Sequence, residues 1–271
     1  MSDEPVRSAP VLGIDIGGSG IKGAPVDLGT GELITKRLRI ETPKKSTPQN
    51  VAKVVGEIVA NFAEEIGPDG PIGITIPAVV THGQTRSAAN IDKSWIDCQA
   101  EQVFEDELGR DIYLVNDADA AGIAEVHYGA AKDHPGLVIL TTLGTGIGTA
   151  IVYRGVLVPN SELGHLEIDG HDAETRAASS IKEREGLSYS QWSIRLQRYY
   201  ERLEALLWPD LIVVGGGVSK NADKFLPKLK LNAELLPAKL LNTAGIVGAA
   251  WLANDAKMHP DLSTTWTKVT V

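Results

Sequence analysis

Two stretches of the sequence share one layout: an apolar strand, a bend rich in glycine, and a second apolar strand. One begins at Val11 and reads VLGIDIGGSGIKGAPVD, and the other spans 137–154 and contains LTTLGTGIGTAIVYR. Each pattern predicts an antiparallel hairpin. The two stretches lie before and after a predicted central strand and helix. The simplest account is therefore a chain of two halves built on one plan, and a coincidence of two common glycine hairpins is the alternative.

The segments between and after the hairpins alternate between strand and helix patterns, as in an α/β protein. Strands are expected over 33–42, 72–77, 111–117 and 210–214, and helices over 48–66, 118–129 and 243–257. A further long helix is expected where large apolar residues recur at helical spacing, namely Trp192, Leu196, Tyr199, Leu203 and Leu207. Those aromatic side chains are expected in the core.

Composition and charge exclude several functional classes. The chain has 271 residues, a formal net charge of -9 and a single cysteine, Cys98. The acidic balance argues against a general nucleic-acid or membrane-surface binder, and one cysteine allows neither an internal disulfide nor a cysteine-based metal site. The first ten residues lack the apolar core of a signal peptide, and no apolar run approaches the ~20 residues of a membrane span. We therefore expect a cytoplasmic protein.

Three of the predicted strands end in glycine-rich turns that indicate phosphate binding. Glycine accepts a positive φ and lets the backbone approach a ligand, successive N–H groups form a concave anion site, and hydroxyl groups add donors. A single turn of this kind is more often only a tight turn, but three together favour phosphate. The expected donor-binding residues are Asp15, Gly17, Gly18, Ser19, Gly20, Lys22, Thr142, Gly144, Thr145, Gly146, Gly215, Gly216 and Gly217.

Asp15 lies inside the first apolar strand, just before its turn. A buried carboxylate is costly unless it is paired. Beside a phosphate site it is expected to bind Mg²⁺ through water, because Mg²⁺ keeps much of its hydration shell. The alternative is a carboxylate that accepts hydrogen bonds from the amides of the turn.

Two common nucleotide motifs do not fit these turns. The stretch GTGIGTA does not have the G-x-G-x-x-G spacing of a dinucleotide-binding fold, and in GGGVSK the glycines and the lysine do not have the spacing of a Walker A loop.

Five ordered stretches resemble the ROK sugar kinases of the actin-like, hexokinase-type ATPase superfamily. They are DIGGSGIKGAPVD, NDADAAGIAE, LGTGIGTAIVYRG, ELGHLEI and IVVGGGVS, and the resemblance extends from Val11 to about Ala253. Within that family, DIGGSGIKGA, AANIDKSW and TLGTGIGTA look closest to the polyphosphate glucokinases of actinobacteria. The resemblance implies an α/β protein with two ribonuclease H-like domains hinged around a cleft.

The domain boundaries expected from this resemblance are a small N-terminal α/β domain over 1–116, which the helix over 243–257 completes, a larger domain over 117–242, and a tail over 258–271. A homodimer is also expected. The sugar is expected deep in the cleft and the phosphoryl donor across the glycine turns.

The resemblance also implies roles for individual residues. Asp117 matches the catalytic base, which accepts the proton of the sugar 6-hydroxyl as its oxygen attacks phosphorus. The alternative for Asp117 and for its neighbour Asn116 is a helix N-cap. The residues expected to bind the sugar are Asn90, Asn116, Asp117, Glu162, His165 and, with an exposed strand position as its alternative, Glu167.

One departure from the family concerns zinc. Many ROK proteins have a zinc-binding cysteine cluster shortly after the Gly-His pair, but the corresponding stretch here contains no cysteine. We therefore expect no structural zinc, and some other group must orient His165. The glutamate that follows the cluster in the family cannot be assigned, and Glu183 and Glu185 are both candidates.

Glucose is the expected acceptor, and polyphosphate or ATP the expected donor. The alternatives are a ROK kinase for mannose or an N-acylated hexosamine, and a non-catalytic sugar sensor. A long polyanion needs cations beyond the turns. Two segments supply them, or are ordinary solvated surface: Lys182 and Arg184 in the first, and Lys220, Lys224, Lys228 and Lys230 in the second.

Overall fold

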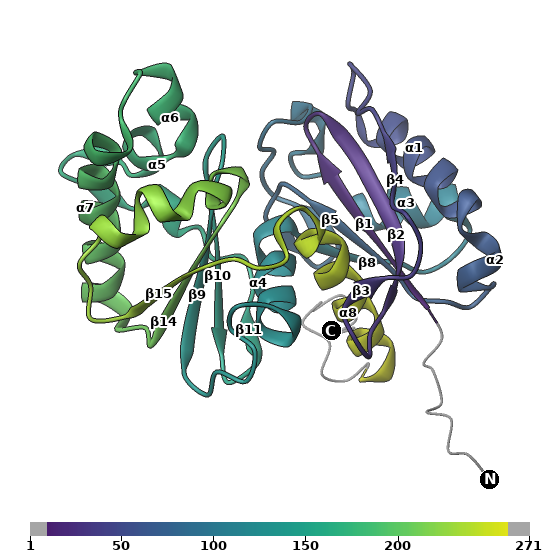
Figure 1. The fold of residues 1–271 in the computed structure, drawn as a ribbon. Coiled ribbons are helices and arrows are strands. Elements are labelled where there is room, and N and C mark those ends of the chain that lie inside the picture. The colour runs from purple at the N-terminus through teal and green to yellow at the C-terminus, as the bar shows by residue number, and fades with distance from the viewer. Residues whose placement is uncertain (1–9, 260–271) are drawn as a thin grey trace, which may run out of the picture. The chain divides into compact units, whose positions relative to one another are not determined.

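The computed structural model describes residues 10–259, and its contacts divide the chain into two compact units. The first unit consists of residues 10–120 together with 245–259, and the second of residues 121–244. The division falls within helix α4 (Asp117–Tyr128). Of the expected tail, residues 260–271 lie outside the described residues. Figure 1 shows the elements of both units.

The first unit is built on a mixed sheet in the strand order β3-β2-β1-β5-β8, with β4 also paired to β2. Strands β1, β5 and β8 are parallel, and β2 returns antiparallel to β1. The strands are β1 (Val11–Gly17), β2 (Gly20–Asp27), β3 (Glu32–Leu33), β4 (Leu38–Ile40), β5 (Ile72–Ile76) and β8 (Tyr113–Asn116). A separate two-stranded sheet joins β6 (Val80–Thr81) to β7 (Gln84–Thr85).

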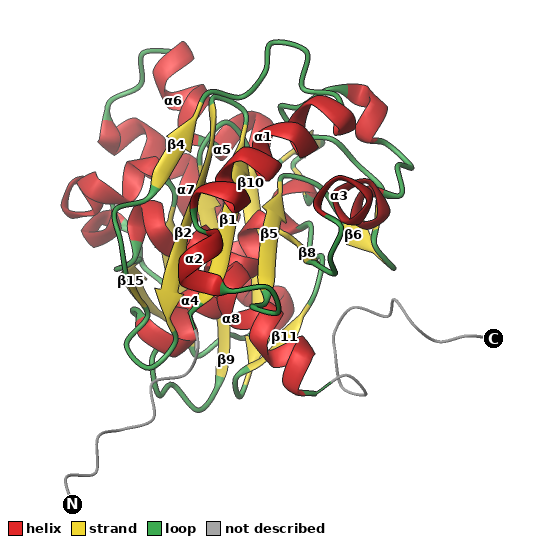
Figure 2. Cartoon of the chain, turned by 90° about the vertical axis from the view of Figure 1, so that its right-hand side faces the viewer, coloured by secondary structure: helices red, strands yellow, loops and turns green. Residues whose placement is uncertain are grey.

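The expected helix over 48–66 is divided into α1 (Pro48–Asn61) and α2 (Ala63–Ile66), and its apolar stripe is buried as predicted. These side chains form one core with Leu12, Ile14 and residues of α3 (Ala100–Leu108). Figure 2 shows α1 lying across the face of β1 and β5.

Helix α8 (Ala244–Met258) packs on the first sheet through glycines. Successive residues of a strand face opposite sides of the sheet, so Gly13 faces away from the core that Leu12 and Ile14 share with α1. A Cβ on Gly13 would lie 1.9 Å from the carbonyl oxygen of Ile246. The backbones of β1 and α8 can approach this closely only because Gly13 has no side chain.

The strand expected over 33–42 is two short strands instead. β3 pairs with Val26 and Asp27, β4 pairs with Ile21–Gly23, and the ladder breaks between them. At the break the carbonyl of Pro25 accepts from the amide of Ile34 at 2.9 Å. The N–H and C=O of one strand residue point to the same side, and proline has no N–H. Pro25 therefore cannot donate to a continuous partner strand.

The second unit has a sheet in the order β11-β10-β9-β14-β15. Strands β10, β9 and β14 take the places that β2, β1 and β5 have in the first sheet. Its strands are β9 (Leu137–Leu143), β10 (Ile147–Tyr153), β11 (Val156–Val158), β14 (Leu211–Gly215) and β15 (Glu234–Pro237). β9 and β10 form the second predicted hairpin, and β14 lies parallel to β9. Both units thus place a glycine hairpin beside a buried parallel strand.

Helix α7 (Tyr189–Leu207) covers the second sheet with the predicted aromatic residues. Trp192, Leu196, Tyr199 and Leu203 are buried in one core cluster. A capping box between Ser188 and Gln191 fixes its start. The other elements of this unit are the short strands β12 (Glu167–Ile168) and β13 (His171–Asp172), helices α5 (Glu174–Ala177) and α6 (Ser179–Arg184), and short 3-10 helices. Within residues 10–259 no helix has both the length and the apolar character needed to cross a lipid bilayer.

Candidate functional site

Most of the predicted site residues of the first unit lie at one edge of its sheet. The parallel strands β1, β5 and β8 all end at this edge. The register pairs Asp15 with Thr75 and Ile76 with Asn116, so the turn after β1 and the residues after β8 flank β5. Catalytic and ligand-binding groups in open α/β sheets concentrate at this carboxyl edge.

Asp117 is the first residue of α4 and directly follows β8. Its Oδ1 accepts a hydrogen bond from the amide of Ala118 at 2.9 Å. The N-terminus of a helix carries partial positive charge and favours a negatively charged carboxylate. The fold therefore presents the Asp117 carboxylate at the carboxyl edge of the sheet, at the start of α4.

Asn116 is buried and acts as a helix cap, which was the alternative to a role in sugar binding. Its Oδ1 accepts from the amides of Ala118 and Asp119 at 2.8 and 3.1 Å, and its Nδ2 donates to the carbonyl of Ala78 at 3.1 Å. These bonds fix the side-chain amide and the start of α4. One Nδ2 hydrogen remains for a ligand, because a primary amide has two.

Asn90 approaches the first glycine turn. Its φ of 61° is in the left-handed region, which asparagine tolerates better than most residues. Its carbonyl oxygen lies 3.1 Å from the position of a Cβ on Gly18, so a larger residue than glycine would meet it there. The predicted sugar ligand and the first predicted phosphate turn are therefore neighbours in the first unit.

Asp15 is paired, but not with the amides of the turn. Its carboxylate lies 3.2 Å from Nζ of Lys22 and accepts from Oγ1 of Thr75 at 3.0 Å. The start of α8 is close, since a Cβ on Gly245 would lie 3.1 Å from Oδ1. A single carboxylate fits Mg²⁺ when water and donor phosphates supply the other ligands. The ion would compete with Lys22 for this carboxylate.

The second and third glycine turns lie side by side in the second unit. β9 and β14 are parallel, and their register pairs Thr142 with Gly215. A Cβ on Gly216 would lie 2.3 Å from the carbonyl oxygen of Leu143. The two turns therefore form one continuous surface at the end of this sheet.

The second turn is fixed on one side and offers amides on the other. Ser180 forms two hydrogen bonds with carbonyl groups of the turn. Its backbone N–H donates to the carbonyl of Gly144 at 3.1 Å, and its Oγ donates to the carbonyl of Thr145 at 2.6 Å. Within residues 10–259 the amides of Thr145 and Gly146 form no hydrogen bond. Two adjacent amides in this state suit the oxygens of a phosphoryl group.

Most glycines of the three turns do not have a positive φ, which corrects that expectation, and at some of them a side chain or backbone group fills the space of a Cβ. Among the glycines of the three turns only Gly216, at 82°, has a left-handed φ. A Cβ on Gly20 would lie 2.7 Å from the guanidinium of Arg39, and one on Gly146 would lie 2.3 Å from a carboxylate oxygen of Glu174. The side chains that hold these turns therefore occupy the volume that a larger residue would need.

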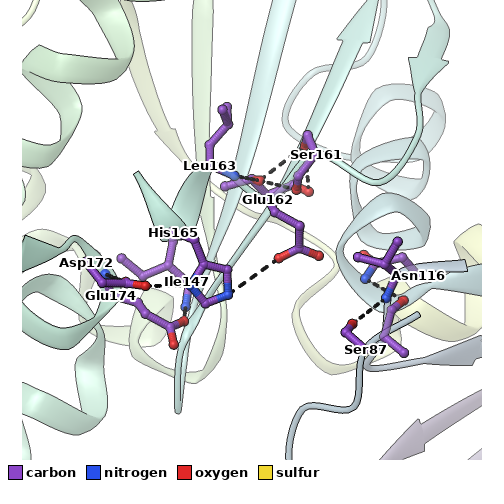
Figure 3. A network of polar contacts seen from close by, with 12 residues as sticks. Ser87, Asn116, Ile147, Ser161, Glu162, Leu163, His165, Asp172 and Glu174 are labelled. Carbon is purple, nitrogen blue, oxygen red and sulfur yellow. Dashed lines mark hydrogen bonds and ion pairs between the residues drawn. The ribbon is translucent and has the colours of Figure 1, made fainter. Parts of the chain in front are cut away.

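The predicted pair Glu162 and His165 is brought together in the second unit. Nε2 of His165 lies 3.9 Å from a carboxylate oxygen of Glu162 (Figure 3). Thr149 of β10 anchors the segment, since its Oγ1 donates to Ser161 at 2.6 Å and accepts from the amide of Leu163 at 3.1 Å. Burial raises the pKa of Glu162 above its usual value. Glu167 is an exposed residue of β12, which was its alternative.

Asp172 orients His165, and the sequence did not identify it. Its Oδ2 lies 2.8 Å from Nδ1 of His165, which leaves Nε2 directed toward Glu162 (Figure 3). The sequence feature that could have identified Asp172 is the dipeptide Asp169-Gly170, which is typical of a two-residue hairpin turn. Both residues have left-handed φ, at 53° and 75°, and β12 and β13 pair across them. The chain is thereby folded back onto His165.

Glu174 is a further carboxylate near His165. Its ligand oxygen lies within 4.8 Å of the ligand atoms of His165 and Asp172, and Oε2 accepts from the amide of Ile147 at 3.1 Å. Glu185 instead forms an ion pair with Arg195 at 2.6 Å, and Glu183 is exposed on α6. Glu174 therefore joins Glu183 and Glu185 as a candidate for the glutamate that follows the cluster in the family, and this assignment stays a prediction.

His165, Asp172 and Glu174 are residue types that can bind a metal ion. All three side chains already form hydrogen bonds. Asp172 accepts from His165 through Oδ2 and from the amide of Glu174 through Oδ1 at 3.1 Å, and Glu174 accepts from the amide of Ile147. Hydrogen bonding thus orients the imidazole, a role that a metal ligand set could also fill. The lack of a structural zinc stays a prediction.

Replacing Asp172 with Asn is expected to lower the pKa of His165. The hydrogen bond that His165 forms with the Asp172 carboxylate is the main cause that raises this pKa above its ordinary value of 6.5. A raised folded-state pKa adds stability that is present below the unfolded pKa and is lost as pH rises through the folded pKa. In the variant the charged imidazole loses this partner, so the stability that wild type gains on the acid side should decrease. An NMR titration of the imidazole measures the shift.

The control for this titration is Asp169→Asn. Asp169 is paired with Arg198 at 2.8 Å and belongs to the same hairpin. This variant removes an equal charge, so the pKa of His165 should stay at its wild-type value. Equal titration curves for wild type and Asp172→Asn would contradict the assigned role of Asp172.

Comparison with known proteins adds the family context. A sequence profile described as ROK family matches residues 11–179. A polyphosphate glucokinase of Mycobacterium tuberculosis (strain ATCC 25618 / H37Rv) is 52% identical over 240 residues, 88% of this chain and 89% of that protein. A polyphosphate glucokinase of Mycobacterium leprae (strain TN) is 48% identical over 249 residues, 92% of this chain and 76% of that protein.

A solved structure is similar over nearly the same range. The crystal structure of an inorganic polyphosphate/ATP-glucomannokinase from Arthrobacter sp. strain KM has a TM-score of 0.87 and 50% sequence identity, and the match covers 91% of this chain and 99% of that chain. Together with the two α/β units, this likeness confirms the expected fold class of the actin-like ATPases.

Proposed function

The chain belongs to the ROK family, and on that basis we propose that it is a kinase that phosphorylates glucose at the 6-hydroxyl with inorganic polyphosphate or ATP as the donor. The observation that carries this proposal is the 52% identity to a polyphosphate glucokinase over 88% of this chain and 89% of that protein. The name of the similar Arthrobacter structure, a glucomannokinase, favours mannose as a second acceptor. The cytoplasmic location and the homodimer stay predictions.

Asp117 is the proposed base. Its carboxylate accepts the proton of the sugar 6-hydroxyl while that oxygen forms a bond to phosphorus and the bond to the bridging oxygen of the donor breaks. Its place after β8, at the positive end of α4, supports this role. Asn90 and Asn116 in the first unit, and Glu162, His165 and Glu174 in the second, are the proposed ligands of the sugar hydroxyls.

The glycine turns are the proposed site of the donor phosphates. The amides of Thr145 and Gly146 donate to phosphoryl oxygens in this proposal, and Ser180 and Glu174 hold the turn in place. Preorganised donors of this kind stabilise charge in the transition state without further rearrangement. Mg²⁺ near Asp15 would neutralise phosphate charge when bound.

The contacts of Tyr189 support a path for a long donor in the second unit. Nζ of Lys182 lies 4.3 Å from the centre of the Tyr189 ring, and Nζ of Lys224 lies 5.5 Å from it. The fold thus brings the two predicted basic segments to one aromatic side chain. We propose that polyphosphate runs along these lysines beside the third turn.

The test is glucose phosphorylation with each donor over a range of salt concentrations. Activity is expected with both donors, and the activity with polyphosphate should fall as salt rises, because a long polyanion held by lysines is sensitive to screening. No activity with polyphosphate, or activity that salt leaves unchanged, would refute the path. Glucose binding without turnover on either donor would favour the sugar sensor.

A further inference from the structure

Arg39 lies directly on the first glycine turn, and no role in the site has been assigned to it so far. Its Nη2 donates to the carbonyl of Ser19 at 2.8 Å. Three guanidinium atoms lie 2.7–2.8 Å from the position of a Cβ on Gly20, so the plane of the guanidinium occupies the space that Gly20 leaves open. Arg39 is nevertheless exposed, and it therefore borders the turn and faces solvent.

The charge of Arg39 is uncompensated within its own unit. The register of β2 and β4 pairs Arg39 with Lys22, so two cations are cross-strand neighbours on one face. Lys22 is neutralised by Asp15. Arg39 forms no ion pair within residues 10–259. Like charges that face each other across a strand pair are destabilising, and this arrangement becomes favourable when an anion binds beside the turn.

The segment that follows Arg39 passes the same turn. The hydroxyl of Thr42 donates to the carbonyl of Gly17, so the chain contacts the turn after leaving β4. Two exposed lysines, Lys44 and Lys45, follow in this segment, and the exposed Glu41 precedes Thr42. Arg39 is therefore the cation that the structure places in contact with the turn.

We propose that Arg39 binds a phosphate of the polyphosphate donor other than the one transferred, at the rim of the turn between β1 and β2. This inference rests on the proposed function. In ATP the phosphate chain ends at a nucleoside after the third phosphate, whereas polyphosphate continues with a charge on every unit. The planar guanidinium donates two parallel hydrogen bonds to one phosphate, which a lysine cannot do. In this proposal the phosphate bound by Arg39 lies beyond the third one, so that Arg39 contacts polyphosphate and not ATP.

The experiment compares wild type, Arg39→Ala and Arg39→Lys in glucose phosphorylation with long-chain polyphosphate and with ATP. Lys53→Ala, an exposed cation on α1, is the control of equal charge change. Arg39→Ala should raise the KM for polyphosphate about tenfold or more, from the loss of charge-assisted hydrogen bonds, and change the KM for ATP less than about twofold. Arg39→Lys should lie between, and Lys53→Ala should match wild type.

Direct binding separates this inference from the proposed function. Calorimetric titration of long-chain polyphosphate without glucose should show weaker binding to Arg39→Ala, with a salt dependence reduced by about 0.7 in the log–log slope, the value of one phosphate contact on a single-stranded polyanion. An equal loss with both donors would show that Arg39 only supports the turn and would overturn the inference. Failure of wild type to bind polyphosphate overturns it as well, whereas wild-type turnover with ATP would still uphold the kinase.

Discussion

Replacing Asp117 with Asn is expected to lower kcat for glucose phosphorylation by about 10²–10⁴-fold with either donor, because the amide cannot accept the proton of the attacking hydroxyl. The amide keeps the size of the side chain, and its oxygen can still accept from the amide of Ala118, so the start of α4 should be preserved. A coupled assay for glucose 6-phosphate measures kcat, and calorimetry should show that glucose still binds.

The control for this variant is Asp106→Asn. Asp106 lies on α3 and accepts a hydrogen bond from Gln102 at 2.8 Å. The chemical change is the same, and activity should not change. A kcat of Asp117→Asn within a few-fold of wild type would exclude Asp117 as the base. Loss of glucose binding together with turnover would point to a structural role at the end of β8.

The substitution Gly13→Ala is expected to reduce the free energy of unfolding by about 1–3 kcal/mol, the usual cost of overpacking a closely packed contact. The new Cβ would lie 1.9 Å from the carbonyl oxygen of Ile246, which is helix backbone and cannot rotate away as a side chain would. Either β1 or α8 must shift. Urea unfolding followed by circular dichroism measures the change.

Gly56→Ala is the matched control, because it makes the same change with the opposite expected sign. Gly56 lies inside α1, and its added Cβ would meet its nearest atom, Oε1 of Glu107, at 3.6 Å, an ordinary contact. Alanine in a helix interior is more stable than glycine by about 0.5–1 kcal/mol. Equal unfolding curves for Gly13→Ala and wild type would show that α8 adjusts at no cost.

The parts of the fold with a strong local pattern could be predicted from the sequence. Both glycine hairpins, the buried stripe of α1 and the aromatic face of α7 follow from periodicity within one segment. The break between β3 and β4 could not be found in this way, since its cause is Pro25 on the neighbouring strand. Short strands depend on their partners more than on their own residues.

The same limit applies to the site. The roles expected for Asp117 and for the pair Glu162–His165 follow from the resemblance to the ROK family, and they stay predictions. Glu174 and Arg39 each form a hydrogen bond with a glycine turn that is distant in the sequence. Their positions depend on the course of the chain between them and that turn. The resemblance left Glu183 and Glu185 as candidates beyond the Gly-His pair, whereas the tight turn at Asp169-Gly170 folds the chain back so that Glu174 lies near His165.

The attachment of α8 to the first sheet reverses the order in which the two units become complete during synthesis. Domains generally fold as units as the chain emerges from the ribosome, the N-terminal one first. Here the second unit has all its residues once 244 has been added, whereas the first still lacks the helix that closes one face of β1. Residues 10–120 therefore stay without their covering helix until residues 245–258 have been added, and the glycine face of their sheet is uncovered until then.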